Sequence, residues 1–98
     1  SQNTWHLSPY VREPDDWQAM EFSAWDGGQA VALLFRGGSE NNSFTVKLRG
    51  LDPEATYLLE FFDAMLGKTE NGRILMEAGF LVTLENKEAT EIILITKK

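Results

Sequence analysis

The feature that most constrains this chain is a turn-forming segment, residues 47–57, between two stretches of strand-like sequence. Residues 44–49 alternate apolar and polar side chains, and a period of two places the apolar set on one face of a β-strand. After the turn, residues 57–62 form a second strand-like stretch. The sequence therefore predicts two strands joined by a β-arch or a hairpin corner.

The residues of this segment are of the types that favour a tight turn. Gly50 tolerates positive φ, Pro53 fixes its own φ near about −65°, and the Asp52 carboxylate can accept a hydrogen bond from the backbone two residues further on. If Gly50 has positive φ, we expect Gly50→Val to cost about 1–3 kcal/mol through backbone strain. None of these residues forms a nucleophile with a base, a metal-ligand set or a phosphate cradle, so the corner is a structural feature.

Further strands are predicted along the chain at similar spacing. In residues 17–25, one face carries Met20, Phe22 and Ala24, and the other carries Ala19, Glu21 and Ser23. Asp26-Gly27-Gly28 is a hairpin signal. Residues 29–36 contain a run, residues 30–35, that is apolar on both faces. This is typical of a central strand covered on both sides, and residues 92–95 share this character. Residues 80–85 form one more alternating stretch.

The remaining segments are less regular. Residues 1–16 contain two prolines and predict an irregular or edge segment, with Trp5, Leu7 and Tyr10 capping one end of the core. Residues 63–72 predict a long loop. Residues 73–79 are the helix-capable segment, with Asn71 as a cap before it and Gly79 as a stop.

Together these patterns predict an all-β fold: an antiparallel two-sheet β-sandwich of Greek-key type with about 6–8 strands. At most one short helical turn is expected, near residues 73–78. The 98 residues suffice for one domain and are too few for two, so residues 1–98 are expected to form a single domain.

Composition narrows the classes of partner. The net charge of −6 disfavours a nucleic acid or an anionic membrane surface, because both need clustered Lys and Arg. No apolar stretch is long enough to cross a bilayer, and the absence of cysteine excludes disulfides and Cys-based metal sites. The balance fits a neutral or sugar-like partner, or no partner beyond the parent chain.

No catalytic, metal or cofactor site is predicted. His6 is the single histidine, so two-His metal sites are excluded and a Ser-His-Asp device would depend on an N-terminal loop residue. Acidic residues are plentiful, but none has a spacing that demands catalysis. Glu21 is the most informative of them: it lies mid-strand between aromatic residues and either faces solvent or pairs with Arg36 or Arg49 across the sheet.

Two tryptophans supply the candidate binding site. Trp17 and Trp25 are eight residues apart on one predicted strand and therefore share a face if the strand is regular. Exposed indoles at these positions, with Tyr10, would form a carbohydrate-stacking platform. The alternative is that the aromatic residues pack in or around the core.

Three segments resemble the C-terminal β-sandwich domain of α-galactosidases of glycoside hydrolase family 36. Residues 5–10 (WHLSPY) and 17–22 (WQAMEF) are similar to the "Y-x-L-T/S-P-Y … W-x-x-x-Q-F" pattern of that family. Residues 48–57 (LRGLDPEATY) form the second segment. Residues 71–80 (NGRILMEAGF) are similar to "S-G-x-x-L-M-x-x-G-L" before a strand. Glu21 stands where the family pattern has Gln, and Asn71 where it has Ser.

The resemblance implies a non-catalytic accessory domain. In that family the two catalytic aspartates lie on an upstream (β/α)8 barrel, so no catalytic residue transfers to this chain. The implied partner is the upstream barrel of the same polypeptide, which the domain packs against and stabilises. Two alternatives remain: a carbohydrate-binding module that uses Trp17, Trp25 or Tyr10, and an adhesion-type sandwich without a link to sugars.

Overall fold

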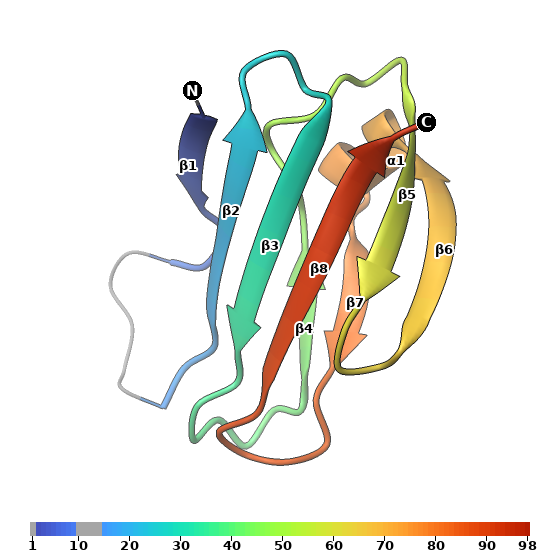
Figure 1. Cartoon of the computed structure of the whole chain (residues 1–98). Helices are drawn as coiled ribbons and strands as arrows, with labels where there is room; N and C mark the ends of the chain where they lie inside the picture. The colour runs from blue at the N-terminus through green and yellow to red at the C-terminus, as the bar shows by residue number, and fades with distance from the viewer. Residues whose placement is uncertain (1, 10–14) are drawn as a thin grey trace.

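The computed structural model describes residues 2–9 and 15–98 and consists of two antiparallel sheets with one short helix (Figure 1). The elements in chain order are β1 (Gln2–His6), β2 (Gln18–Ala24), β3 (Gln29–Phe35), β4 (Ser43–Val46), β5 (Thr56–Phe61), β6 (Leu66–Asn71), α1 (Gly72–Glu77), β7 (Phe80–Thr83) and β8 (Thr90–Lys97). The larger sheet has the order β1-β2-β3-β8-β5-β6, and β4 pairs with β7 in the smaller sheet. The predicted all-β sandwich is confirmed.

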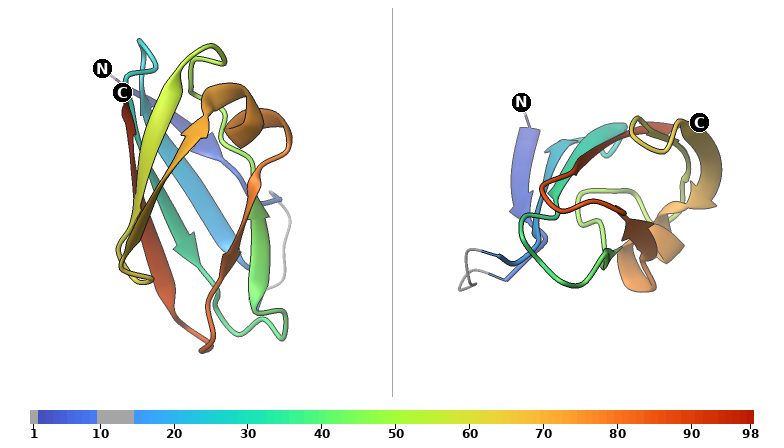
Figure 2. Two further views of the ribbon diagram at one scale, coloured as in Figure 1. Left: turned by 90° about the vertical axis from the view of Figure 1, so that its right-hand side faces the viewer. Right: turned by 90° about the horizontal axis from the view of Figure 1, so that it is seen from below.

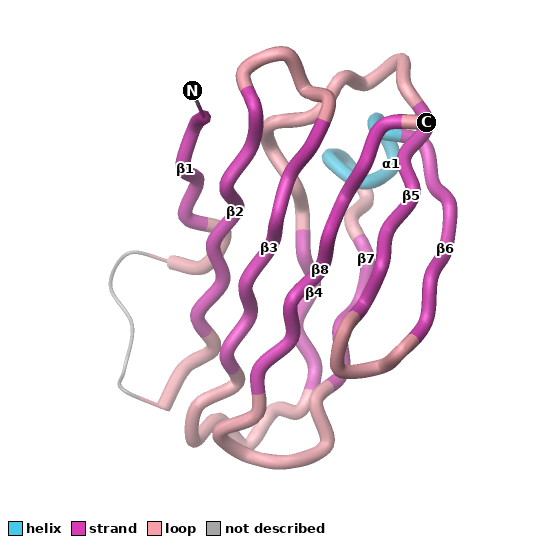
Figure 3. Tube along the Cα trace, viewed as in Figure 1, coloured by secondary structure: helices cyan, strands magenta, loops and turns pink. Residues whose placement is uncertain are grey.

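The smaller sheet covers the inner face of the larger one. Figure 2 shows the six-stranded sheet curving around β4 and β7, and Figure 3 shows α1 near the end of this smaller layer. The core between the layers is apolar, and its fully buried side chains include Ala32, Val46, Leu59, Ile93 and Ile95. Burial of this side-chain set is the main source of stability available to the fold.

The corner that follows β4 is a β-arch. Strand β4 belongs to the smaller sheet, whereas β5 belongs to the larger one, so the chain crosses between layers instead of reversing within one sheet. The predicted alternation is confirmed, because Val46 and Leu48 are buried while Lys47 and Arg49 are exposed. The Leu48 N–H donates to the Leu75 carbonyl at 3.0 Å, which ties the start of the corner to α1.

The predicted turn and cap residues act as expected. The Asp26 carboxylate accepts from the Gly28 N–H at 2.8 Å in the β2–β3 hairpin, where Gly27 has φ of 73°. Asn71 caps α1 by accepting from the Arg73 N–H at 2.8 Å. Gly79 ends the helical segment with φ of 76°, a conformation that favours glycine.

The long loop predicted at residues 63–72 is wrong, because residues 66–71 form β6. This strand pairs with β5 at the edge of the larger sheet. Its side chains are mostly exposed and polar, so no apolar alternation marks it in the sequence. The N-terminal segment contains an edge strand, β1, while Tyr10 and residues 11–14 lie outside the described residues.

The central strands are covered on one face only by the described residues. In β3, Ala30, Ala32 and Leu34 are buried, but Leu33 on the opposite face is 41% exposed. In β8, Ile92 is likewise 41% exposed. The expectation that residues 29–36 are covered on both sides is therefore not met within this chain, although the strand lies in the middle of its sheet.

Candidate functional site

The buried face of β2 presents a carboxyl group to the corner. Glu21 is fully buried, and its side chain accepts hydrogen bonds from the Arg49 N–H at 2.7 Å and the Gly50 N–H at 2.9 Å. The Ser23 hydroxyl donates to the same carboxyl group. Both expectations for Glu21 are corrected: it neither faces solvent nor pairs with an arginine side chain. Its oxygens accept hydrogen bonds from backbone N–H groups in the arch, which follows the end of β4 and has no ladder partner there among the described residues.

Close packing at the same place explains why residue 50 is glycine. A Cβ at Gly50 would overlap the Ser23 side chain and lie 2.8 Å from Trp5 Nε1. Among the described residues, the glycines with positive φ are Gly27, Gly37 and Gly79. The predicted strain at Gly50 is therefore wrong in its cause, because contact with β1 and β2 excludes a larger side chain there. The Arg49 guanidinium lies over the Trp5 ring, 4.9 Å from its centroid.

A buried tyrosine joins the corner to the β2–β3 hairpin. The Tyr57 hydroxyl accepts from the Asp52 N–H at 2.8 Å and donates to the Gly27 carbonyl. Its side chain is fully buried. Corner and hairpin are thus held together by one phenol group, and the corner is fixed at both of its ends.

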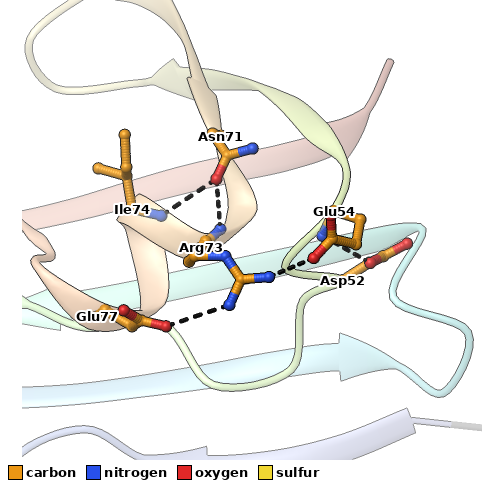
Figure 4. A network of polar contacts seen from close by, with 6 residues as sticks. All are labelled: Asp52, Glu54, Asn71, Arg73, Ile74 and Glu77. Carbon is orange, nitrogen blue, oxygen red and sulfur yellow. Dashed lines mark hydrogen bonds and ion pairs between the residues drawn. The ribbon is translucent and has the colours of Figure 1, made fainter.

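A surface network connects the corner to α1 (Figure 4). Asp52 accepts from the Glu54 N–H at 2.9 Å, as the turn chemistry predicts, while Arg73 pairs with Glu54 and, at 3.5 Å, with Glu77. Lys97 lies 3.3 Å from the Asp52 carboxylate. The hydrogen bond from Glu54 and then the contact with Lys97 lower the pKa of Asp52. These exposed pairs add little stability individually.

The other buried charged residues also serve the backbone. Glu91 accepts from the N–H groups of Asp63 at 2.7 Å and Ala64 at 3.1 Å, at the turn between β5 and β6. Arg36 donates to the carbonyls of Leu84 at 2.8 Å and Glu85 at 2.9 Å. Glu91 and Arg36 therefore hydrogen-bond to the backbone at a turn and at a strand end, which is a structural role.

Neither a metal-ligand cluster nor a membrane-spanning helix is found in the part of the chain that the structure describes. In residues 2–9 and 15–98, no group of three or more His, Cys, Asp or Glu side chains is arranged to hold a metal ion. In the same residues, no helix is long and apolar enough to cross a membrane.

The two tryptophans lie in different environments. Trp17 is 5% exposed, donates from Nε1 to the Asn41 carbonyl at 2.7 Å, and stacks on Phe44 with ring centroids 5.6 Å apart. Trp25 is 70% exposed and borders a small hollow with Asn3 and Asp26.

The two indoles therefore do not form a pair of exposed side chains. Trp17 continues the series of Ala19, Glu21 and Ser23, which is the buried face of β2. Trp25 belongs to the same series but follows the last residue of the strand, where its side chain reaches solvent. Tyr10, the third candidate residue, lies outside the described residues. Of the predicted platform, Trp25 alone is seen to be exposed.

Comparison with known proteins identifies the family. Residues 17–95 match the sequence model of the glycosyl hydrolase family 36 C-terminal domain. The chain belongs to this family. The family 36 match covers every strand from β2 to β7 and all but the last two residues of β8, including the corner and its Glu21 anchor.

Curated relatives and solved structures agree with the family 36 assignment. Alpha-galactosidase C of Emericella nidulans is 32% identical over 88% of this chain, and the probable alpha-galactosidase C of Aspergillus flavus is 32% identical over 96%. The chain spans 11% and 12% of these two relatives. The galactosidase domain of the alpha-galactosidase-sucrose kinase AgaSK superposes with a TM-score of 0.77 at 26% identity, covering 97% of this chain and 13% of that one. The GH36 alpha-galactosidase AgaA from Geobacillus stearothermophilus shares the fold, with a TM-score of 0.78 at 19% identity over 99% of this chain and 13% of that one.

Proposed function

We propose that this domain is a non-catalytic C-terminal accessory domain of an α-galactosidase-like glycoside hydrolase. Its role is to pack against the upstream (β/α)8 catalytic barrel of its own chain and to stabilise it. The observation that carries the proposal is that nearly the whole chain matches about one eighth of much longer α-galactosidases, within a family described as a C-terminal domain.

The arrangement of acidic groups supports a non-catalytic role. A glycosidase of the usual type needs two carboxyl groups that both reach the scissile bond. Among the described residues, the two fully or nearly fully buried acids are Glu21 and Glu91, and both accept hydrogen bonds from backbone N–H groups. Asp52 is engaged by the turn and by Lys97. These groups hold the fold and leave no paired acids among them for chemistry.

The test compares the isolated domain with its parent. The parent chain is expected to hydrolyse a nitrophenyl α-galactoside, whereas residues 1–98 alone show no turnover. Deleting residues 1–98 from the parent is expected to shorten the half-life of activity on heating, because the barrel loses a docked surface. Turnover by the purified domain, or a deletion that leaves thermal inactivation unchanged, would contradict the proposal.

Sugar binding at Trp25 is the second candidate function. Its support is the 70% exposure of the indole beside the polar residues Asn3 and Asp26. Titration of tryptophan fluorescence with galactose, raffinose and galactomannan tests it, with Trp25→Ala as the matched variant. A sugar-dependent shift that Trp25→Ala abolishes would support binding. No shift at millimolar sugar would remove this function.

A further inference from the structure

The outer face of the larger sheet, which points away from β4 and β7, has an unusual composition. Strands β2, β3 and β8 place twelve side chains on this face, four from each strand. None of the twelve is charged, although 24% of the chain is charged. Eight of them are apolar: Met20, Phe22, Ala24, Val31, Leu33, Phe35, Ile92 and Leu94.

Strand register makes these residues one continuous surface. Met20 lies opposite Leu33, which lies opposite Ile92, and the next outward row contains Phe22, Val31 and Leu94. Neighbouring side chains on one face of a sheet are in contact range, so the two rows form a block across three strands. We call this block the outer apolar face.

The exposed apolar surface continues beyond these three strands to Phe62. Phe62, just after β5, donates its N–H to the Ile92 carbonyl at 3.0 Å and is 59% exposed. Beside it, Met20, Leu33, Phe35 and Ile92 contribute to the lining of a shallow hollow of about 320 Å³. The outer apolar face is therefore both accessible and hollowed, as a surface that receives protruding side chains would be.

The opposite outer surface of the sandwich shows that this composition is specific. On the smaller sheet, the outward residues of β4 and β7 are Ser43, Thr45, Leu81 and Thr83, and the hydroxyls of Ser43 and Thr83 are 2.9 Å apart. Leu81 is the single apolar side chain among them and is 64% exposed. Both outward surfaces are built from antiparallel strands, but the smaller sheet carries mostly hydroxyl side chains, and β2, β3 and β8 of the larger one carry mostly apolar ones.

We propose that the outer apolar face is the surface that docks the preceding, catalytic part of the parent chain. The inference rests on the proposed function and adds the location of the interface. Contiguous exposed apolar patches mark interaction surfaces, and an uncharged face fits an apolar protein partner better than a charged or polar one.

Two observations favour the parent chain over a second copy of this domain. The matched α-galactosidases are about eight times as long as this chain, so their catalytic part supplies ample surface within the same polypeptide. Two copies would each bring a net charge of −6, which opposes their association. An apolar face that is permanently covered by another part of the same chain is not exposed to solvent, so it does not promote aggregation.

The experiment measures accessibility in the intact parent. Because residues 1–98 contain no cysteine, single thiols can be introduced with Leu33→Cys on the outer apolar face and Leu81→Cys on the smaller sheet. Maleimide labelling of each peptide is followed by mass spectrometry in native and denatured protein. We expect native labelling of the Leu33→Cys parent to be slowed at least about tenfold relative to denatured protein, whereas the Leu81→Cys parent labels at a similar rate in both states.

The pattern of labelling separates the two proposals. Slow labelling at position 33 with fast labelling at position 81 supports the outer apolar face as the interface. Slow labelling at position 81 with fast labelling at position 33 would overturn this face while leaving the docking role intact. Fast labelling at both positions would overturn the outer apolar face as the interface, whereas the packing role itself is judged by the deletion of residues 1–98.

Discussion

The two faces of β2 differ from the usual pattern, because polar side chains are buried beside Ala19 on the inner face while the outer face carries apolar ones. Its inner face presents Glu21 and Ser23 to the core, where both are fully buried. Its outer face presents Met20 and Phe22, which the described residues leave partly exposed. The inner polar groups have a task, since they bind the backbone at Arg49 and Gly50. We propose that the outer apolar groups also have a role, which is to contact another part of the parent chain.

The comparison teaches that hydrophobic alternation identifies the two faces of a strand but not which one its own domain buries. The buried carboxyl group of Glu21 is tolerated because it accepts hydrogen bonds from the Arg49 and Gly50 N–H groups and the Ser23 hydroxyl. An exposed apolar row is tolerated when a partner covers it. The predictions that follow separate residues that hold the domain from residues that belong to its surface.

The largest effect is expected from Glu21→Ala. The variant leaves the Arg49 and Gly50 N–H groups and the Ser23 hydroxyl without their acceptor, and each unsatisfied buried group costs about 1–3 kcal/mol. We expect a loss of about 4 kcal/mol in unfolding free energy, measured by urea denaturation. Glu21→Gln, which keeps one acceptor oxygen and the side-chain volume, should lose less. Equal stability of Glu21→Ala and the wild type would show that the carboxyl group is not an anchor.

Gly50→Val is expected to be nearly as damaging. Its side chain would overlap Ser23 and crowd Trp5, and overpacking of this kind costs about 3 kcal/mol. The matched control is Gly67→Ala in the edge strand β6, where the nearest neighbour of an added Cβ is the Leu59 carbonyl oxygen at 3.5 Å. Thermal unfolding should separate the two variants clearly. Similar melting temperatures for both would contradict the close approach at the corner.

Much of the fold was predictable because local chemistry and fold agree. The alternation of residues 44–49, the hairpin at Asp26-Gly27-Gly28 and the caps at Asn71 and Gly79 all appear as expected. Edge strand β6 was not predictable from periodicity. Its ladder with β5 stabilises it through backbone hydrogen bonds, while its outward polar side chains give no apolar signal.

The candidate site was less predictable than the fold. Sequence spacing correctly put Trp17 and Trp25 in one alternating series, yet strand length and coverage by the smaller sheet decide that one is buried and the other exposed. The role of Glu21 depends on a contact with residues 28 and 29 positions away, which no local pattern reveals. In the sequence, an acid between Met20 and Phe22 fits ordinary alternation with a polar outer face, so its position gives no sign that it is buried.

Asn71→Ala tests the smaller contribution of the helix cap. Asn71 accepts from the backbone N–H groups of Arg73 and Ile74, and loss of an N-cap costs about 1 kcal/mol. The measurement is the urea midpoint of the variant, with Asn71→Ser as a control that retains a capping oxygen. An alanine variant as stable as the serine variant would show that the cap is dispensable.

The smallest effect is the pH dependence from Asp52. Its pKa is lowered in the folded state, first by the hydrogen bond from Glu54 and then by Lys97, so folding favours the ionised form. This contribution is present above the ordinary Asp pKa of about 4 and is lost as pH falls through the folded value. The melting temperature of the wild type should therefore fall more on acidification than that of Asp52→Asn. Parallel curves for the two proteins would contradict the assignment.

The central claim is that the inner face of the larger sheet holds this domain together, while its outer apolar face serves the parent chain. The most direct measurement is the melting temperature of Glu21→Ala and Leu33→Lys, each in the isolated domain and in the parent. We predict that Glu21→Ala lowers it in both contexts, whereas Leu33→Lys lowers it in the parent alone, because its exposed site becomes buried only there. A Leu33→Lys effect as large in the isolated domain as in the parent would contradict the claim.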